Sequence, residues 1–124
     1  MTENSRMRQP FKQGTIVLVE MEFSDHLGKS YRPCIVVRSL RLHIQGRPRY
    51  VYPVVPLSNA ELPFGDISPR LPAREGGLPA KSTALCAFVQ TVPSSRITGC
   101  VGMLSESEYE QVAEGLAAAL GLRT

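Results

Sequence analysis

The 124-residue sequence contains no tryptophan, two histidines and three cysteines, and no apolar run approaches the roughly 18 residues that a membrane-spanning helix needs. The first twelve residues are polar and mixed in charge, and they lack the apolar core of a secretory signal. We therefore expect a cytoplasmic protein that does not enter a membrane. A chain of this length suits one domain built around one hydrophobic core.

The few cysteines exclude two common kinds of small scaffold. Cys34, Cys86 and Cys100 are widely spaced, with no C-x-x-C pair and no histidine at metal-ligand spacing. Neither a structural zinc site nor a disulfide framework is expected, and nothing in the sequence calls for another cofactor. Cys34 and Cys86 lie in apolar stretches, so we predict that both are buried. Familiar catalytic motifs are also missing, including the serine nucleophile elbow and the phosphate-binding loop G-x-x-x-x-G-K-[ST].

Positive charge is concentrated in one part of the chain. There is no acidic residue between Asp25 and Glu61, whereas four glutamates follow between residues 106 and 114. The basic residues in the first interval are Lys29, Arg32, Arg38, Arg41, Arg47 and Arg49. Guanidinium groups suit phosphate contacts, which favours a nucleic-acid surface. Arginine richness is equally typical of proteins from high-GC genomes, so both interpretations stay open.

The pattern of apolar residues predicts a protein that is mainly β with one helix at its C-terminus. β-rich runs separated by turn residues predict strands at residues 15–23, 33–40, 50–57, 82–92 and 97–104. Pro53 and Pro56 lack the amide proton that a central strand donates, so we expect the third strand at a sheet edge or a bulge. We interpret residues 1–12 as a disordered lead-in and 13–124 as one domain, with a long loop over 58–81.

Ser105 and Glu108 form a capping-box pattern, which predicts the start of a helix. Apolar residues follow at three- and four-residue spacing, and Gly121 is a plausible end. Residues 93–96 are predicted to form a turn or a short helical turn. These elements together predict a small, strongly bent sheet or barrel that is closed by a packing helix.

The step Arg32-Pro33 is the most informative candidate for function. Proline disfavours helical geometry at the residue before it, so Arg32 is expected to be extended at the start of a strand. A guanidinium that projects from such a fixed backbone is suited to stabilising charge. The loop over residues 24–31, which precedes it, provides the polar residues Asp25, His26, Lys29 and Tyr31.

The segment over residues 14–37, GTIVLVEMEFSDHLGKSYRPCIVV, resembles the N-terminal signature of the PemK/MazF family of toxin endoribonucleases. In that signature a strand G-[DT]-I-V-x-V, a loop that ends in G-x-x-x-R-P and an apolar strand follow one another. Three further segments are similar to family motifs in the same order, at residues 54–58, 91–97 and 101–112. The resemblance extends from about residue 14 to residue 122.

The resemblance implies an SH3-like barrel of the MazF/CcdB type, a homodimer, and the toxin of a type II toxin–antitoxin pair. It implies cleavage of single-stranded RNA without a metal ion, and an acidic antitoxin as partner. By position, Arg32 would stabilise the phosphorane and protonate the leaving oxygen, and Ser58 would hydrogen-bond the phosphate. The remaining candidates for RNA contact are Asp25, Lys29, Tyr31, Asn59, Gln90 and Arg96.

One departure from the family pattern affects the choice of general base. Family members often have an acidic residue shortly before the T-[IVL] step, but residues 85–90 contain none. His26 is therefore the candidate base, with Asp25 as the alternative, because histidine titrates near neutral pH.

Structural roles remain open for the same residues. Arg32 could pair with Glu20 or Glu22, Ser58 could cap a turn, Gln90 could face solvent, and Arg96 could bind turn carbonyls. Two other functions also remain. The chain could be an RNA- or antitoxin-binding module of the same fold without catalysis, or a CcdB-like gyrase poison, which has no need of a phosphate-binding arginine.

Overall fold

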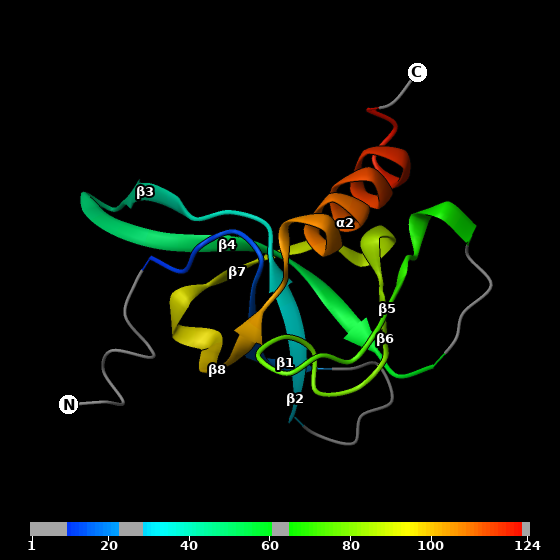
Figure 1. The fold of residues 1–124 in the computed structure, drawn as a ribbon. Helices are drawn as coiled ribbons and strands as arrows, with labels where there is room; N and C mark the ends of the chain where they lie inside the picture. Colours follow the sequence, from blue (N-terminus) through cyan, green and yellow to red (C-terminus); the bar gives the residue numbers. More distant parts are fainter. Residues whose placement is uncertain (1–9, 23–28, 61–64, 123–124) are drawn as a thin grey trace.

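The computed structural model describes residues 10–22, 29–60 and 65–122 (Figure 1). Within these ranges the strands are β1 Thr15–Glu22, β2 Lys29–Val36, β3 Leu40–Ile44, β4 Arg47–Ser58, β5 Arg70–Leu71, β6 Ser82–Ala84, β7 Gln90–Pro93 and β8 Ile97–Met103. The helices are the 3₁₀ turns η1 Gly65–Ile67, η2 Cys86–Phe88 and η3 Ser94–Arg96, and the α-helix α2 Glu106–Ala119. No helix in the described part of the chain is long and apolar enough to cross a membrane.

The strands form one strongly curved sheet in the order β5-β6-β4-β2-β1-β8, with β3 and β7 pairing additional stretches of β4. Its two faces cover two hydrophobic clusters. Ile16 and Val55 pack with Val112 and Leu116 of α2 on one face. Tyr52 lies in the other cluster, where Phe11 from the predicted lead-in is buried against its ring. The prediction of a mainly β fold with a C-terminal helix is confirmed.

The prediction of an edge or a bulge for the strand that holds Pro53 and Pro56 is wrong, because β4 pairs with four other strands and shows no shift of register in these pairings. The carbonyl of Pro53 accepts from the amide of Val37 at 2.9 Å. An ordinary residue at position 53 would donate its amide proton to the carbonyl of Val37 in return. That carbonyl accepts instead from the hydroxyl of Tyr109 at 3.2 Å and from the side-chain amide of Gln13 at 3.1 Å. The carbonyl of Pro56 accepts from the amide of Leu85 at 2.9 Å.

The predicted strand over residues 82–92 is in fact three elements. Ala84 of β6 lies opposite Leu57, and Gln90 of β7 lies opposite Val54, so the segment meets β4 at two separate places. The 3₁₀ turn η2 connects them, closed by a hydrogen bond from the amide of Phe88 to the carbonyl of Leu85 at 2.9 Å. The sequence predicted one continuous strand because nearly every residue in the segment is apolar or β-branched.

Three further differences concern β2, β3 and the predicted long loop. β2 begins at Lys29, four residues before the predicted start at Pro33, and ends at Val36. β3 was not predicted; it forms a hairpin with β4 through Gln45 and Gly46, whose φ angles are 53° and 77°. The segment 58–81 contains η1 and β5 and is not a structureless loop.

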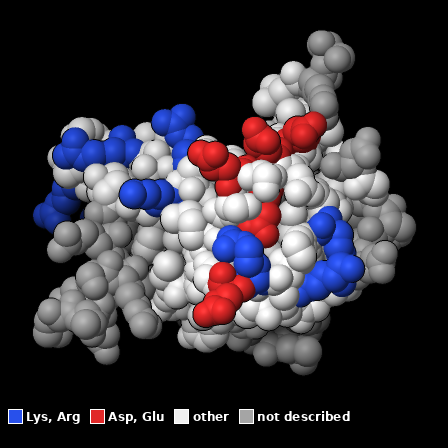
Figure 2. Space-filling model, in the orientation of Figure 1, with Lys and Arg blue, Asp and Glu red and all other residues white. Residues whose placement is uncertain are grey.

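Charged side chains are segregated on the surface (Figure 2). Basic side chains gather over the β3–β4 hairpin, which projects from the body of the molecule (Figure 1), and acidic side chains follow α2. Arg41, Arg47 and Arg49 are the exposed arginines of the two hairpin strands. The separation of positive and negative charge that the sequence predicts is therefore present on the surface of the folded protein.

The capping box at the start of α2 is confirmed and is reinforced by an arginine from the loop before β6. The Ser105 hydroxyl accepts from the amide of Glu108 at 3.2 Å, and the Glu108 carboxylate accepts from the amide of Ser105 at 2.8 Å. Arg74 donates to the same carboxylate at 3.0 Å and to the carbonyl of Met103 at 2.7 Å. The bond from Arg74, helped by those from Ser105, holds the pKa of the Glu108 carboxyl below its ordinary value although burial opposes this.

Because the folded state favours ionised Glu108, its charge stabilises the fold above the ordinary carboxyl pKa, and this contribution is lost as pH falls through the lowered pKa. We expect Glu108→Gln, which keeps a capping oxygen, to lower the free energy of unfolding by about 1 kcal/mol at pH 7. Urea unfolding followed by circular dichroism should show that this difference shrinks below about pH 4. A difference that stays constant between pH 2 and pH 7 would exclude the carboxylate charge as its source.

Candidate functional site

Arg32 lies within β2 rather than at its start, opposite Val19 of β1, and Pro33 lies opposite Leu18. Its backbone is extended, as the following proline predicts. The half-buried guanidinium reaches across to the end of β4, where it donates to the carbonyl of Leu57 at 3.4 Å. Two neighbouring strands therefore determine where this positive charge lies.

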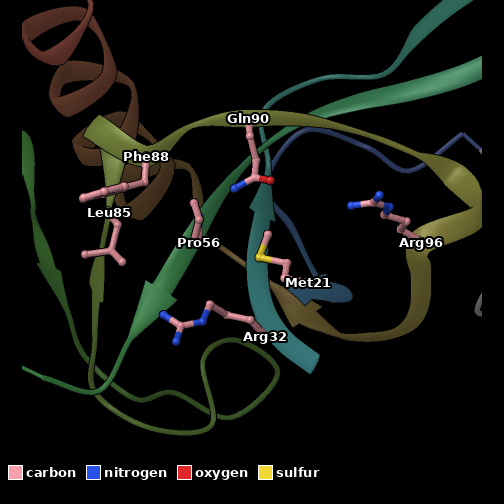
Figure 3. Close-up of a pocket in the computed structure, with 7 residues that line it drawn as sticks. All are labelled: Met21, Arg32, Pro56, Leu85, Phe88, Gln90 and Arg96. Carbon is pink, nitrogen blue, oxygen red and sulfur yellow. The ribbon is translucent and has the colours of Figure 1, made fainter. Parts of the chain in front are cut away.

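Arg32 lines a cavity of about 390 Å³ (Figure 3). In the close-up, the amide of Gln90 and the guanidinium of Arg96 point toward the middle of the cavity, where Met21 lies, and the guanidinium of Arg32 extends below Pro56 on the side of Leu85. These side chains come from β2, β7, η3 and β1. The other residues that line the cavity are Pro56, Leu85 and Phe88.

A second, adjoining cavity of about 220 Å³ lies on the other side of Arg32. It contains the exposed ring of Tyr31 together with Ser58 and Asn59 at the end of β4. Ser30, Pro33 and Leu57 complete its lining. Arg32 is the residue that the two cavities share, so a single extended ligand lying across both would pass over its guanidinium.

Most of the candidate residues that the structure describes converge on these two cavities. Gln90 and Arg96 meet Arg32 in the first, and Tyr31, Ser58 and Asn59 meet it in the second. Lys29 is the first residue of β2, and only its backbone is described. Asp25 and His26 lie outside the described residues.

The Ser58 hydroxyl accepts a hydrogen bond from the amide of Ala60 at 3.1 Å, so it does cap the turn after β4. This bond uses an oxygen lone pair and leaves the hydroxyl proton for an anionic oxygen. The capping role and a phosphate contact are therefore compatible at Ser58.

The sequence-based candidates did not include the apolar lining of the first cavity. The sequence predicted only strands for the runs that contain Met21, Pro56, Leu85 and Phe88. Phe88 is 57% exposed, which is unusual for a residue in an apolar run. The one available signal was the position of residues 85–90, where the sequence departs from the family pattern.

The lining of the two cavities is basic and apolar. Within the described ranges no acidic side chain lines either of them. No group of three or more histidine, cysteine, aspartate or glutamate side chains comes together there or elsewhere in the described structure. The chemistry that these residues offer is anion binding by two guanidinium groups, hydrogen bonding by a hydroxyl and two amides, and stacking on exposed aromatic rings.

A small, strongly curved sheet with one C-terminal helix is the fold of the MazF toxins. The model of the PemK-like, MazF-like toxins of type II toxin–antitoxin systems matches residues 12–120, and the chain belongs to this family. A comparison with characterised protein sequences found no significant match.

Solved structures of MazF-type toxins share the fold. The Mycobacterium tuberculosis toxin MazF-mt6 is 20% identical with a TM-score of 0.65, covering 89% of this chain and 99% of that one. A mycobacterial endoribonuclease in complex with its cognate antitoxin is 16% identical with a TM-score of 0.66, covering 93% and 99%. The MazE–MazF structure (Form-III) from Deinococcus radiodurans is 16% identical with a TM-score of 0.65, covering 90% and 96%.

Burial next to the site should make two of the three thiols unreactive. Burial raises the pKa of Cys34 to about 12, although the nearby Arg32 charge opposes the shift, and it raises the pKa of Cys86 to about 11. Cys100 is exposed. We expect 5,5′-dithiobis(2-nitrobenzoate) to label one thiol of the native protein rapidly and three after denaturation, and to label none rapidly in native Cys100→Ser. Rapid labelling of native Cys100→Ser would contradict the described packing.

Proposed function

We propose that the protein is a metal-independent endoribonuclease toxin that cuts single-stranded RNA by attack of a 2′-hydroxyl on the adjacent phosphate. MazF-like toxins are in general endoribonucleases. The observation that supports this activity most directly is the position of Arg32, which lines one cavity with Gln90 and Arg96 and a second cavity with Ser58 and Asn59.

The proposed reaction uses these residues as follows. A base removes the proton of the 2′-hydroxyl, and that oxygen forms a bond to phosphorus. The Arg32 guanidinium and the Ser58 hydroxyl stabilise the negative charge on the phosphorane. The bond to the 5′-oxygen then breaks as Arg32 supplies a proton to it. The products are a 2′,3′-cyclic phosphate and a 5′-hydroxyl end.

The first cavity has the features of a base-binding pocket. Its walls are apolar, the Phe88 ring is exposed, and Gln90 offers an amide that can donate to and accept from a base edge. Tyr31, which is 59% exposed, offers a second stacking surface beyond Arg32. We infer that unpaired nucleotides occupy both cavities, with the phosphate between them on Arg32.

We propose that the toxin acts in the cytoplasm as a homodimer and is neutralised by an acidic antitoxin. Two of the similar solved structures contain a MazF-type toxin with its antitoxin. The exposed arginines of the β3–β4 hairpin provide a basic surface that an acidic chain would complement.

The Arg32→Ala variant tests the phosphate contact. Incubated with a long RNA in the presence of EDTA, wild type should produce 5′-hydroxyl ends, and Arg32→Ala should cut about 100- to 1,000-fold more slowly because the phosphorane loses its charge partner. Arg74→Ala, which removes an arginine remote from both cavities, is the matched control. Equal cleavage by wild type and Arg32→Ala would refute the proposed site, and RNA binding without cleavage by wild type would favour a binding module.

The role of His26 as general base makes a prediction about pH. The kcat of wild type should rise with pH through the histidine range near 6.5 and then level off, because the neutral imidazole is the reactive form. His26→Ala should lose that rise together with most of the activity. If His26→Ala keeps the wild-type profile, Asp25 is the remaining candidate, and Asp25→Asn should then be the inactive variant.

A further inference from the structure

Arg70 of β5 contacts the turn that carries Ser58 and Asn59 but lines neither of the two cavities. One guanidinium nitrogen, Nη1, donates to the carbonyls of Asn59 at 3.0 Å and Ala60 at 2.9 Å. The same nitrogen donates to the hydroxyl of Thr83 in β6 at 2.8 Å. A single atom of Arg70 therefore contacts two successive carbonyls of the turn.

Thr83 completes the connection from β6 to the turn. Its hydroxyl accepts from Arg70 and donates to the carbonyl of Ala60 at 2.7 Å. The amide of Ala60 in turn donates to the Ser58 hydroxyl. The orientation of the Ser58 oxygen is thus linked to Arg70 through one residue.

Two arginines contact this part of the chain. Arg32 lines both cavities and contacts the carbonyl of Leu57, whereas Arg70 lines neither cavity and contacts the carbonyls of Asn59 and Ala60. We propose that Arg70 is a positioning residue, which fixes the turn so that the Ser58 hydroxyl faces the scissile phosphate beside Arg32. This inference rests on the proposed endoribonuclease activity.

The arrangement is not explained by stability alone. The Nε of Arg70 is buried and has no hydrogen-bond acceptor among the described residues, which costs free energy. β5 has only two residues, and its second, Leu71, is fully buried and already anchors the strand in the core. The arginine beside Leu71 therefore bears a desolvation cost, and the hydrogen bonds of its side chain go to the turn and to Thr83.

Steady-state RNA cleavage separates positioning from folding. We expect Arg70→Met to lower kcat about 10- to 100-fold with little change in KM, because a small displacement of catalytic groups is costly in rate. Arg70→Lys should restore part of the loss, since an ammonium offers three protons near the position of Nη1. The kcat of Thr83→Ser should stay close to that of wild type, and the kcat of Thr83→Val should not.

Arg74→Ala is the matched control, because Arg74 also donates to backbone carbonyls but contacts the start of α2 from the loop before β6. It should lower the unfolding midpoint without lowering kcat. A loss of kcat in Arg74→Ala as large as in Arg70→Met would show that the effect comes from general destabilisation, and would overturn the inference.

A double-mutant cycle with Ser58 decides whether Arg70 acts through that residue. If it does, adding Arg70→Met to Ser58→Ala should change kcat less than twofold, whereas independent effects would multiply. If the effects of the two substitutions on kcat multiply, the inference is overturned, while the proposed function is left intact.

Amide exchange of Ala60 tests the positioning without any need for cleavage. Measured by NMR, this amide should exchange at least tenfold faster in Arg70→Met than in wild type, and at the wild-type rate in Arg74→Ala. Unchanged exchange in Arg70→Met overturns the inference. Absence of cleavage by wild type, by contrast, would refute the proposed function.

Discussion

The site depends on one constraint, which is the register of β4 against four other strands. Pairing with β2 brings Arg32 beside the end of β4, and pairing with β7 brings Gln90 to the same place. β4 contains three prolines, and the carbonyl of Val37, which lacks the amide proton of Pro53, accepts from the side chains of Tyr109 and Gln13 instead. The helix therefore contributes to the cleft indirectly, by supporting the strand on which the cleft is built.

The parts of the fold that follow from neighbouring residues could be predicted from the sequence. The capping box requires only Ser105 and Glu108 at the correct spacing, and the extended backbone of Arg32 requires only the next residue. The convergence of Gln90 and Arg96 on Arg32 was predictable only through the order of family motifs, because these residues are far apart in the chain. Their roles toward RNA remain proposals.

The parts that depend on tertiary pairing could not be predicted. Pro53 and Pro56 favour an edge or a bulge when judged locally, and only the contacts of Tyr109 and Gln13 with Val37 show how Pro53 is accommodated in a central strand. The segment 82–92 is divided into β6, η2 and β7 because it pairs with β4 at two separate places, which no local pattern indicates. Phe88 was predicted only as part of a strand, because an apolar pattern does not distinguish a buried position from the wall of a cleft.

Arg32, Arg70 and Arg74 each donate to backbone carbonyls, and they differ in the part of the molecule that they contact. Arg74 faces the helix capping box, Arg70 faces the turn at the end of β4, and only Arg32 faces both cavities. The most direct test of this account uses RNA with 2′-deoxy substitutions, which can bind but cannot be cut. In NMR spectra of protein with ¹⁵N-labelled arginine, titration of this RNA should shift the guanidinium resonance of Arg32 and leave that of Arg74 in place. An unchanged Arg32 resonance at saturating RNA would contradict the account.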